Sequence, residues 1–282
     1  MVEYSVLIEV LHKMKFPSIL CILALVSTML APAPAYSDPS PPKVEPVKAL
    51  MITGGGYHDY KKQQHIISKG VSARANVKWT IAFENPKSGL PSIYNNPDWA
   101  KGYDVIVHNE CHARFKDPEV VNKIVKAHLD NAVGVVMIHC AMHTFRDTST
   151  KEWDKLVGVQ SRRHGAKFPI KVTNAKPEHP IMKAFPESWT SPQGELYVTN
   201  PLEGTTPLGI GGKPDNPKVK KQVCVWASTY GKTKTFGITL GHHNVTVEQK
   251  AYLDLLSRGI LWTCDKLGDD GKPKKGYEAL AK

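Results

Sequence analysis

Apolar residues along the chain alternate between short uninterrupted runs and longer segments with helical spacing. Residues 47–52 form a short apolar run that ends at three glycines, and a helix can begin after them with Asp59 as its N-cap. Residues 77–83 alternate apolar and polar side chains, which predicts a second strand ending before a turn at 85–86. Residues 104–107 predict a third strand. Strands that alternate with helices in this way favour an α/β fold.

The next segments predict the middle of the fold. Asp117 followed by Pro118 begins a helix whose apolar residues share one face: Val120, Val121, Ile124, Val125 and Leu129. Residues 133–138 are apolar without interruption, as in a central parallel strand covered on both faces. The S-x-x-E pattern at 149–152 is a capping box and predicts a short helix.

The second half has a less regular pattern. Residues 168–172 predict a strand, and a loop rich in glycine and proline covers 201–217, so we expect this part to decorate the domain. Two apolar runs, 223–227 and 235–240, flank a turn and predict a hairpin. A second capping box at 246–249 predicts a final helix that buries Tyr252, Leu255, Leu256 and Ile260.

The N-terminus has the features of a signal peptide. Two lysines precede an apolar run at 19–30, and the A-x-A cleavage pattern follows at 33–35. The run is shorter than the roughly 20 residues of a membrane-spanning helix, and no later run is longer, so no transmembrane segment is predicted. We expect a secreted or periplasmic protein. Met14 begins a segment that is itself a complete signal peptide, so either Met1 or Met14 can be the start.

These patterns divide the chain into four parts. Residues 1–35 are the predicted signal peptide, and residues 36–46, rich in proline and serine, form a linker. Residues 47–266 form one domain, whose length is routine for a single α/β unit. Residues 267–282 form a polar tail that we expect to be loosely held.

The net charge of +11 raises the question of an anionic partner, such as nucleic acid, an envelope surface or an acidic glycan. The lysines are scattered, however, and their two clusters at 218–221 and 272–275 contain no interleaved aromatic residues. We therefore interpret the charge as a solvated basic surface and expect no nucleic-acid partner.

Four cysteines remain after cleavage of the signal peptide: Cys111, Cys140, Cys224 and Cys264. An oxidising compartment permits disulfides, none of the four is spaced as C-x-x-C, and their pairing stays open. Cys140 ends the central strand, where a Cys–His hydrolase carries its nucleophile. Its neighbours Ile138 and Met142 are too large for a nucleophile elbow, which favours a buried, inert cysteine.

Histidines gather where the predicted strands end. Seven of the twelve histidines follow strands: His58, His108, His112, His139, His143, His242 and His243. Ligands of open α/β sheets bind outside the carboxyl ends of the strands, so these side chains suit proton transfer or a divalent metal. Taken singly, each is more often a loop residue bonded to backbone, and the convergence carries the prediction. A metal is the secondary interpretation, because only the H-x-E-x-H spacing at 108–112 suggests one.

The three glycines at 54–56 have two interpretations of equal weight. They permit a tight turn after the strand, which requires positive φ, and they direct amide N–H groups toward a ligand oxygen. The same residues can do both.

Several motifs together resemble one known family. They are Gly54-Gly-Gly-Tyr-His58, Gly134-Val-Val-Met-Ile-His139-Cys-Ala-Met-His-Thr-Phe145, Arg163-His-Gly165, His179-Pro180, Glu195-Leu-Tyr197, Leu240-Gly-His242 and Gly259-Ile-Leu-Trp262. In order and spacing they resemble the ThuA-like (trehalose utilisation) family over residues 47–262. The resemblance implies a flavodoxin-like or class I glutamine amidotransferase-like fold, a three-layer α/β domain with a mostly parallel sheet. It also implies a role in disaccharide or oxidised-sugar metabolism.

The resemblance also implies roles for individual residues. In the amidotransferases the elbow reads G-x-C-x-G, and here His139 takes the nucleophile's place, so glutaminase chemistry is not expected. The implied catalytic residues are His139, as general acid or base, with His58, His242 and Glu195. The implied substrate-binding residues are Gly55, Gly56, Tyr57, Glu110, His164 and Tyr197, and Trp226 is a further aromatic residue for stacking on a pyranose.

The sequence departs from the family pattern at two places. Gly194 stands where an aspartate commonly precedes the glutamate, and Cys140 stands where a small or hydroxyl residue is commoner. Either change could alter the substrate. Our first hypothesis is histidine acid/base chemistry on a disaccharide or 3-keto sugar, with a small carbohydrate as the partner. The alternatives are a non-catalytic carbohydrate-binding envelope protein and a metal-dependent hydrolase, while the substrate, any cofactor and the oligomeric state stay open.

Overall fold

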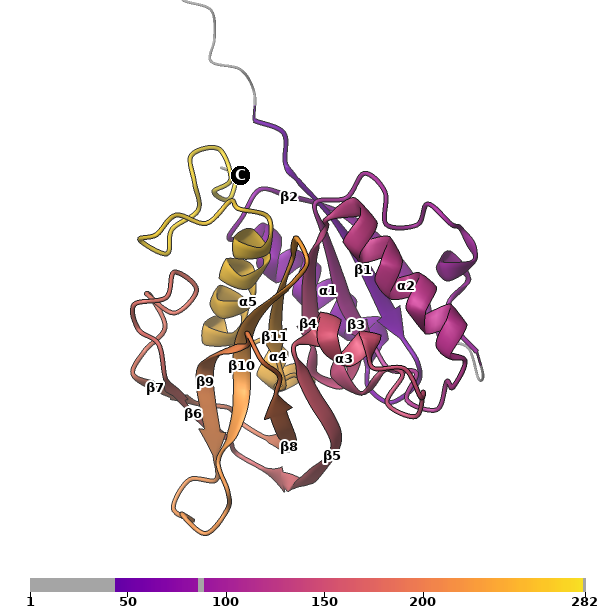
Figure 1. Ribbon diagram of the computed structural model, residues 1–282. Helices are drawn as coiled ribbons and strands as arrows, with labels where there is room; N and C mark the ends of the chain where they lie inside the picture. Colours follow the sequence, from indigo (N-terminus) through magenta and orange to yellow (C-terminus); the bar gives the residue numbers. More distant parts are fainter. Residues whose placement is uncertain (1–43, 86–88, 281–282) are drawn as a thin grey trace, which may run out of the picture. The chain divides into compact units, whose positions relative to one another are not determined.

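A computed structural model describes residues 44–85 and 89–280. The predicted signal peptide and all but the last three residues of the predicted linker lie outside these ranges. The described chain is built around a nine-stranded sheet with the order β2-β1-β3-β4-β11-β10-β9-β6-β7 (Figure 1). A separate two-stranded sheet pairs β5 with β8.

Five adjacent strands of the large sheet are parallel to one another: β1 (Val47–Gly54), β2 (Val77–Glu84), β3 (Val105–Glu110), β4 (Gly134–Ile138) and β11 (Thr233–Ile238). With β11 in the fifth place, their order is the 2-1-3-4-5 order of flavodoxin-like folds. The α/β, flavodoxin-like prediction is therefore confirmed.

The other four strands extend the sheet in antiparallel fashion: β10 (Gln222–Tyr230), β9 (Thr206–Gly212), β6 (Lys171–Asn174) and β7 (Ser188–Thr190). The prediction that the second half only decorates the domain is thus wrong, because these strands continue its sheet. The small sheet consists of β5 (Val159–Phe168) and β8 (Gly194–Pro201).

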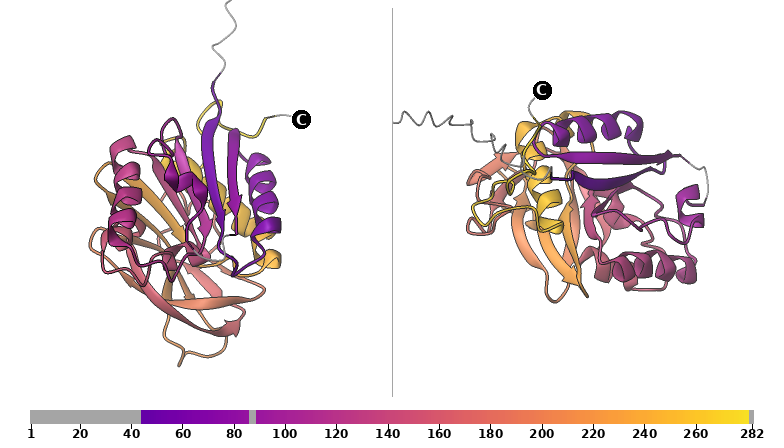
Figure 2. Two further views of the ribbon diagram at one scale, coloured as in Figure 1. Left: turned by 90° about the vertical axis from the view of Figure 1, so that its right-hand side faces the viewer. Right: turned by 90° about the horizontal axis from the view of Figure 1, so that it is seen from above.

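Helices cover both faces of the parallel strands and complete three layers (Figure 2). One face carries α1 (Tyr60–Ser72) and α5 (Lys250–Thr263), and the other carries α2 (Pro118–Asn131) and α3 (Glu152–Val157). The shorter helices are η1 (Ser92–Asn95), η2 (His139–His143) and α4 (Asn244–Val247). No helix within the described ranges is long and apolar enough to cross a membrane.

The central strand β4 shows why its sequence is apolar without interruption. Val136 and Ile138 pack in the core cluster beneath α1 and α5, whereas Val135 and Met137 pack in the cluster beneath α2 and α3. All four side chains are at most 1% exposed. A strand covered on both faces buries every side chain, which confirms the predicted position of this segment.

Two predicted helix starts are confirmed and two are wrong. Asp59 caps α1 by accepting from the Lys62 backbone N–H, and Asp117 caps α2. The predicted capping boxes at 149–152 and 246–249 do not form. Helix α3 begins only at Glu152, and the Thr246 hydroxyl donates to the Gln193 carbonyl 2.9 Å away instead of capping a helix.

The segment after α5 reaches the turn between α1 and β2. Leu267 is 7% exposed, and the Asn76 backbone N–H donates to the Tyr277 carbonyl at 3.0 Å. An isolated bridge pairs Ala75 with Glu278. Residues 276–278 are thus held by contacts with the turn between α1 and β2, in contrast to the loosely held tail that the sequence predicted.

Candidate functional site

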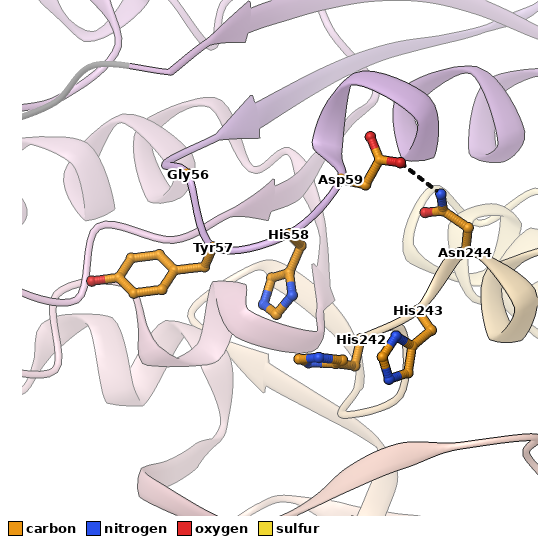
Figure 3. Close-up of a pocket in the computed structure, with 7 residues that line it drawn as sticks. All are labelled: Gly56, Tyr57, His58, Asp59, His242, His243 and Asn244. Atoms are coloured by element: carbon orange, nitrogen blue, oxygen red, sulfur yellow. Dashed lines mark hydrogen bonds between the residues drawn. The ribbon is translucent and has the colours of Figure 1, made fainter.

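A polar pocket lies at the carboxyl edge of the parallel strands. Its main part, about 330 Å³, is lined by two short segments that follow β1 and β11: Gly56, Tyr57, His58, Asp59, His242, His243 and Asn244 (Figure 3). An adjoining part of about 170 Å³ shares Tyr57, His58 and His242 and adds residues after β3 and β4 and from the β5–β8 sheet. Ligand sites of α/β sheets occur at this edge, where the strand order reverses between β1 and β3.

The glycine turn after β1 delivers His58 to this pocket. Gly54, Gly55 and Gly56 all have positive φ, and a Cβ on Gly55 would overlap the backbone carbonyl of Cys111. Glycine is therefore required for the chain to pass between the two strand ends. A Cβ on Gly56 would meet nothing within 4 Å, so this residue borders open space in the pocket.

His139 occupies a left-handed turn directly after β4, with φ of 49°. This is a sharp strand-to-helix turn of the kind that presents nucleophiles in α/β hydrolases. Its Nδ1 lies 2.6 Å from the Thr239 carbonyl oxygen, which can only accept, so Nδ1 carries the proton. Nε2 consequently keeps its lone pair and lies 3.4 Å from the hydroxyl of Tyr197, which borders the pocket.

The Glu195 carboxylate lies among three imidazoles from three segments. Its Oε2 is 3.1 Å from His242 Nδ1, 3.6 Å from His164 Nε2 and 3.7 Å from His139 Nε2. Burial raises the pKa of Glu195, against the opposing effects of His164 and Lys167. The raised pKa makes it easier for the Glu195 carboxyl to exchange a proton close to its imidazole neighbours.

His58, His139 and His242 are kept neutral by their surroundings. Burial, reinforced by repulsion from His242, lowers the pKa of His58 to about 3. Burial and the neighbouring His243 lower the pKa of His242 to about 4. Burial and His58 lower the pKa of His139 well below its usual value, although the bond to Thr239 opposes the shift. At neutral pH these rings carry free lone pairs and no charge.

Tyr197 is 1% exposed and packs against two imidazole rings. The His143 ring stacks on one face with centroids 4.2 Å apart and planes 8° apart, and the centroid of the His164 ring is 5.3 Å away. His143 is fixed in turn by a 2.7 Å contact between its Nε2 and the Ser161 hydroxyl. The ring faces of Tyr197 are therefore not free for a sugar, and its hydroxyl is the part that can act.

Two contacts fix the strand-end loops against each other. The Asn244 side-chain amide donates to Asp59 Oδ2 at 2.8 Å (Figure 3), and the buried Gln63 amide donates to the Gly241 carbonyl at 2.8 Å. Because Asp59 also caps α1, the loops that carry His58 and His242 share one anchor. The two imidazoles are held in place before any ligand binds.

A disulfide forms part of the pocket wall. Cys111 follows β3, Cys140 follows β4, and the two Cα atoms are 5.4 Å apart. Cys140 is the residue that immediately follows His139 in the sequence. A nucleophilic thiol at Cys140 is therefore excluded in the oxidised protein, and Cys224 and Cys264 are the free cysteines of the described chain.

Glu110 lies outside the pocket, in a separate buried cluster. It is 0% exposed, and its Oε1 is 2.8 Å from His108 Nδ1 while its Oε2 is 3.2 Å from His112 Nε2. Burial alone would raise the pKa of Glu110, but the two imidazoles outweigh it and lower the pKa to about 2. The structure gives this carboxylate no route to a pocket ligand, in contrast to its predicted role in binding substrate.

The other residues predicted to be functional also include some that lie together at the site and one that does not. His58, His139, His242 and Glu195 come together, as the strand-end argument and the resemblance predicted. The prediction that Trp226 stacks on a sugar is wrong, because its ring is fully buried and its indole N–H donates to the Val157 carbonyl. The remaining residues predicted to bind substrate border the two parts of the pocket, except Gly55 within the turn: Gly56, Tyr57, His164 and Tyr197.

Some residues of the pocket were not predicted as functional. Arg146 borders the adjoining part of about 170 Å³, and Asn244 borders the main part of about 330 Å³. His143 was predicted only as one of the strand-end histidines, and the disulfide cysteines were not predicted to pair. Their common signal is position, since each lies within eight residues after the end of a parallel strand.

Three imidazoles are placed as a set that could hold a metal ion. His58, His139 and His242 each offer one ring nitrogen within 4.8 Å of the nitrogens of the other two. The H-x-E-x-H segment at 108–112 forms no such set with open space beside it, because Glu110 fills the position between its two histidines.

Comparison with known proteins identifies the family. A family model described as ThuA, trehalose utilisation, matches residues 48–263, so the chain belongs to this family. Among curated proteins, no sequence matches the chain.

Solved structures show the same fold. A putative ThuA-like protein from Parabacteroides merdae is 19% identical, has a TM-score of 0.64, and the match covers 84% of this chain and 98% of that one. A second from Bacteroides uniformis is 16% identical with a TM-score of 0.61, over 80% and 96% of the chains. A β-galactosidase from Bacillus circulans is 10% identical with a TM-score of 0.50, over 77% of this chain and 31% of its own. At these identities the likeness concerns the fold alone.

Proposed function

We propose that this ThuA family member acts on a small carbohydrate, in the first place a disaccharide or an oxidised 3-keto sugar, by acid/base chemistry in the strand-edge pocket. The observation that carries the proposal is the Glu195 carboxylate, which lies within 3.7 Å of three imidazoles and borders an open pocket. The description of the family as one of trehalose utilisation supports the substrate class.

The acid/base assignment follows from the opposite pKa shifts in the pocket. Burial raises the pKa of Glu195, whereas it lowers the pKa of His139 well below its usual value. Pairs of titratable groups with opposite shifts are typical of acid/base sites. His139 Nε2 can accept a proton by way of the Tyr197 hydroxyl, which borders the pocket, and Glu195, which also borders it, can exchange a proton with the sugar. The Tyr197 hydroxyl, 3.4 Å from His139 Nε2, is a donor for a developing oxyanion.

The main part of the pocket suits a polyhydroxylated ligand. Its lining is rich in hydrogen-bonding groups, and its 330 Å³ lies in the range of roughly 300–1,000 Å³ for small-molecule sites. Tyr57 at the rim is 52% exposed, so one face of its ring is free to pack against a pyranose. This assigns Tyr57 the stacking role that the buried Trp226 cannot have.

We also propose that the protein is exported to the periplasm or the exterior. The signal-peptide pattern in residues 1–35 motivates this proposal, and the Cys111–Cys140 disulfide supports it because such bonds persist in oxidising compartments. Fractionation of cells that express the full chain, with N-terminal sequencing of the product, tests it. A chain that stays in the cytoplasm with its first residues intact would contradict export.

The catalytic proposal is tested by ligand binding and turnover with matched variants. A thermal-shift screen of residues 36–282 against disaccharides and their 3-keto derivatives identifies a ligand, since binding to the native state raises the melting temperature. Product formation from that ligand should fall by about 100-fold or more in Glu195→Gln, the usual loss when an acid/base group is removed. His65→Gln is the control, because His65 is exposed on α1 and borders neither part of the pocket.

Each outcome separates the functional classes. Turnover that Glu195→Gln abolishes while binding persists supports acid/base catalysis. A ligand that binds the wild-type protein without turnover would instead assign a carbohydrate-binding protein to the same pocket. Equal turnover by Glu195→Gln and the wild-type protein would remove the proposed mechanism.

A further inference from the structure

The rings of His58, His139 and His242 converge on one point of the pocket. The His58 ring centroid is 4.7 Å from each of the other two, which are 5.4 Å from each other. One ring nitrogen of each histidine lies within 4.8 Å of those of its partners. The three come from loops after three different parallel strands, so the sheet itself brings them together.

The nitrogen atoms in this cluster lack the partners that buried imidazoles normally have. Among the described residues, neither His58 Nε2 nor His242 Nδ1 has a hydrogen-bond partner, although both atoms are buried. His242 Nδ1 is 3.1 Å from Glu195 Oε2, but the contact lacks hydrogen-bond geometry. Buried polar atoms are seldom left without a partner, so these atoms point to a further group between them.

His139 has the second contact that is typical of a metal ligand. Metal-binding histidines usually donate their other ring N–H to a carbonyl or carboxylate, which fixes the ring and its tautomer. His139 Nδ1 donates to the Thr239 carbonyl at 2.6 Å and leaves Nε2 unprotonated. The same Nε2 is 3.7 Å from Glu195 Oε2.

We propose that His58, His139 and His242 bind one divalent transition-metal ion, zinc in the first place, through one ring nitrogen each, with the fourth position left for water or substrate. Two ligands about 2.1 Å from a zinc ion are roughly 3.0–3.4 Å apart. The imidazole nitrogens, within 4.8 Å of one another, reach it when each moves inward by about 1 Å.

This inference deepens the proposed function and rests on it only for the role of the ion. Three imidazole donors with an open fourth position suit a catalytic zinc ion, and a sugar oxygen would take that position. A bound ion would occupy the His139 Nε2 lone pair and polarise the sugar oxygen in its place, while Glu195 would keep its role in proton exchange. Binding of the ion itself can be measured without any sugar.

The test is metal binding by untagged protein that has been treated with a chelator and dialysed. Titration calorimetry with Zn²⁺ should give one ion per chain, and Co²⁺ should give visible d–d absorption bands. His242→Gln should weaken Zn²⁺ binding at least 10–100-fold, because one of three imidazole ligands is lost. Glu195→Gln keeps all three imidazoles and should change Zn²⁺ binding far less than His242→Gln. His242 borders open space at 13% side-chain exposure, so its replacement leaves the core intact.

The exposed His65→Gln variant is the matched control and should bind Zn²⁺ like the wild-type protein. Circular dichroism of each variant separates loss of a ligand from loss of the fold. The inference is overturned if the wild-type protein binds neither ion, or if His242→Gln and His58→Gln both bind Zn²⁺ as tightly as the control.

These results are independent of the proposed function. Chelator-treated protein that still converts a sugar, with loss in Glu195→Gln, would leave acid/base catalysis standing and remove the metal. Stoichiometric Zn²⁺ binding without any sugar binding or turnover would do the reverse.

Discussion

The Cys111–Cys140 disulfide should make a large, measurable contribution to stability. The two cysteines are 29 residues apart, and the loop that they close contains helix α2 and strand β4. In the chain-entropy model, closing a loop of this length in the unfolded state stabilises the fold by about 3.6 kcal/mol at 25 °C. For a domain of this size each kcal/mol corresponds to roughly 2–4 °C, so reduction should lower the melting temperature by about 7–14 °C.

The assay is urea unfolding of the same protein with and without a phosphine reductant. Comparing one sequence in two redox states avoids any change in packing. The reduced unfolded chain is less constrained and exposes more surface, so the dependence of the unfolding free energy on urea should also steepen. The double variant Cys111→Ala/Cys140→Ala is the control, because its unfolding midpoint should not respond to reductant.

Two results would refute this reasoning. Labelling of Cys111 and Cys140 by iodoacetamide in unfolded, unreduced protein would show that the bond does not form. Equal midpoints with and without reductant, despite an intact bond, would show that the loop does not constrain the unfolded chain.

Two further predictions concern packing and pH. Gly237→Ala should destabilise the domain by about 3 kcal/mol in urea unfolding, because its Cβ would overlap the buried Trp226 ring, whereas Gly165→Ala, with open space around it, should change little. The pKa of His58 and that of His143 are each lowered to about 3, from an unfolded value near 6.5. Below pH 6.5 the unfolded chain therefore binds protons that the folded apo-protein cannot bind. The unfolding free energy should consequently fall as the pH is lowered from 6.5 toward 3. Between pH 7.5 and 9 these two groups should not change it. A constant urea midpoint from pH 7.5 to 4.5 would show that these imidazoles are not buried in neutral form.

The sequence predicted those features of the fold that are encoded locally. The N-caps Asp59 and Asp117, the apolar strand β4 and the hairpin of β10 and β11 all depend on a few neighbouring residues. The place of that hairpin could not be predicted, because β11 pairs with β4 at a distance of about 100 residues. Strand partners far apart in the chain leave no local signal.

The same distinction applies to the site. His58, His139 and His242 could be predicted from strand ends, and Glu195 from the family resemblance. The role of Glu110 was misjudged because side chains two apart on a strand share a face, so Glu110 points with His108 into the protein. The disulfide follows from the adjacency of β3 and β4, which is a property of the sheet and not of either cysteine.

The position of β11 has a consequence for how the protein is made. Residues 233–238 complete the parallel half of the sheet between β4 and β10, and the loop after them brings Gly241 to Gln63, 178 residues earlier. A growing chain that has not yet reached residue 233 carries β4, its most completely apolar strand, with one edge open to other chains. The histidine pocket therefore cannot form until residues 233–243 have been made, and until then the open edge of β4 is a place where nascent chains can aggregate.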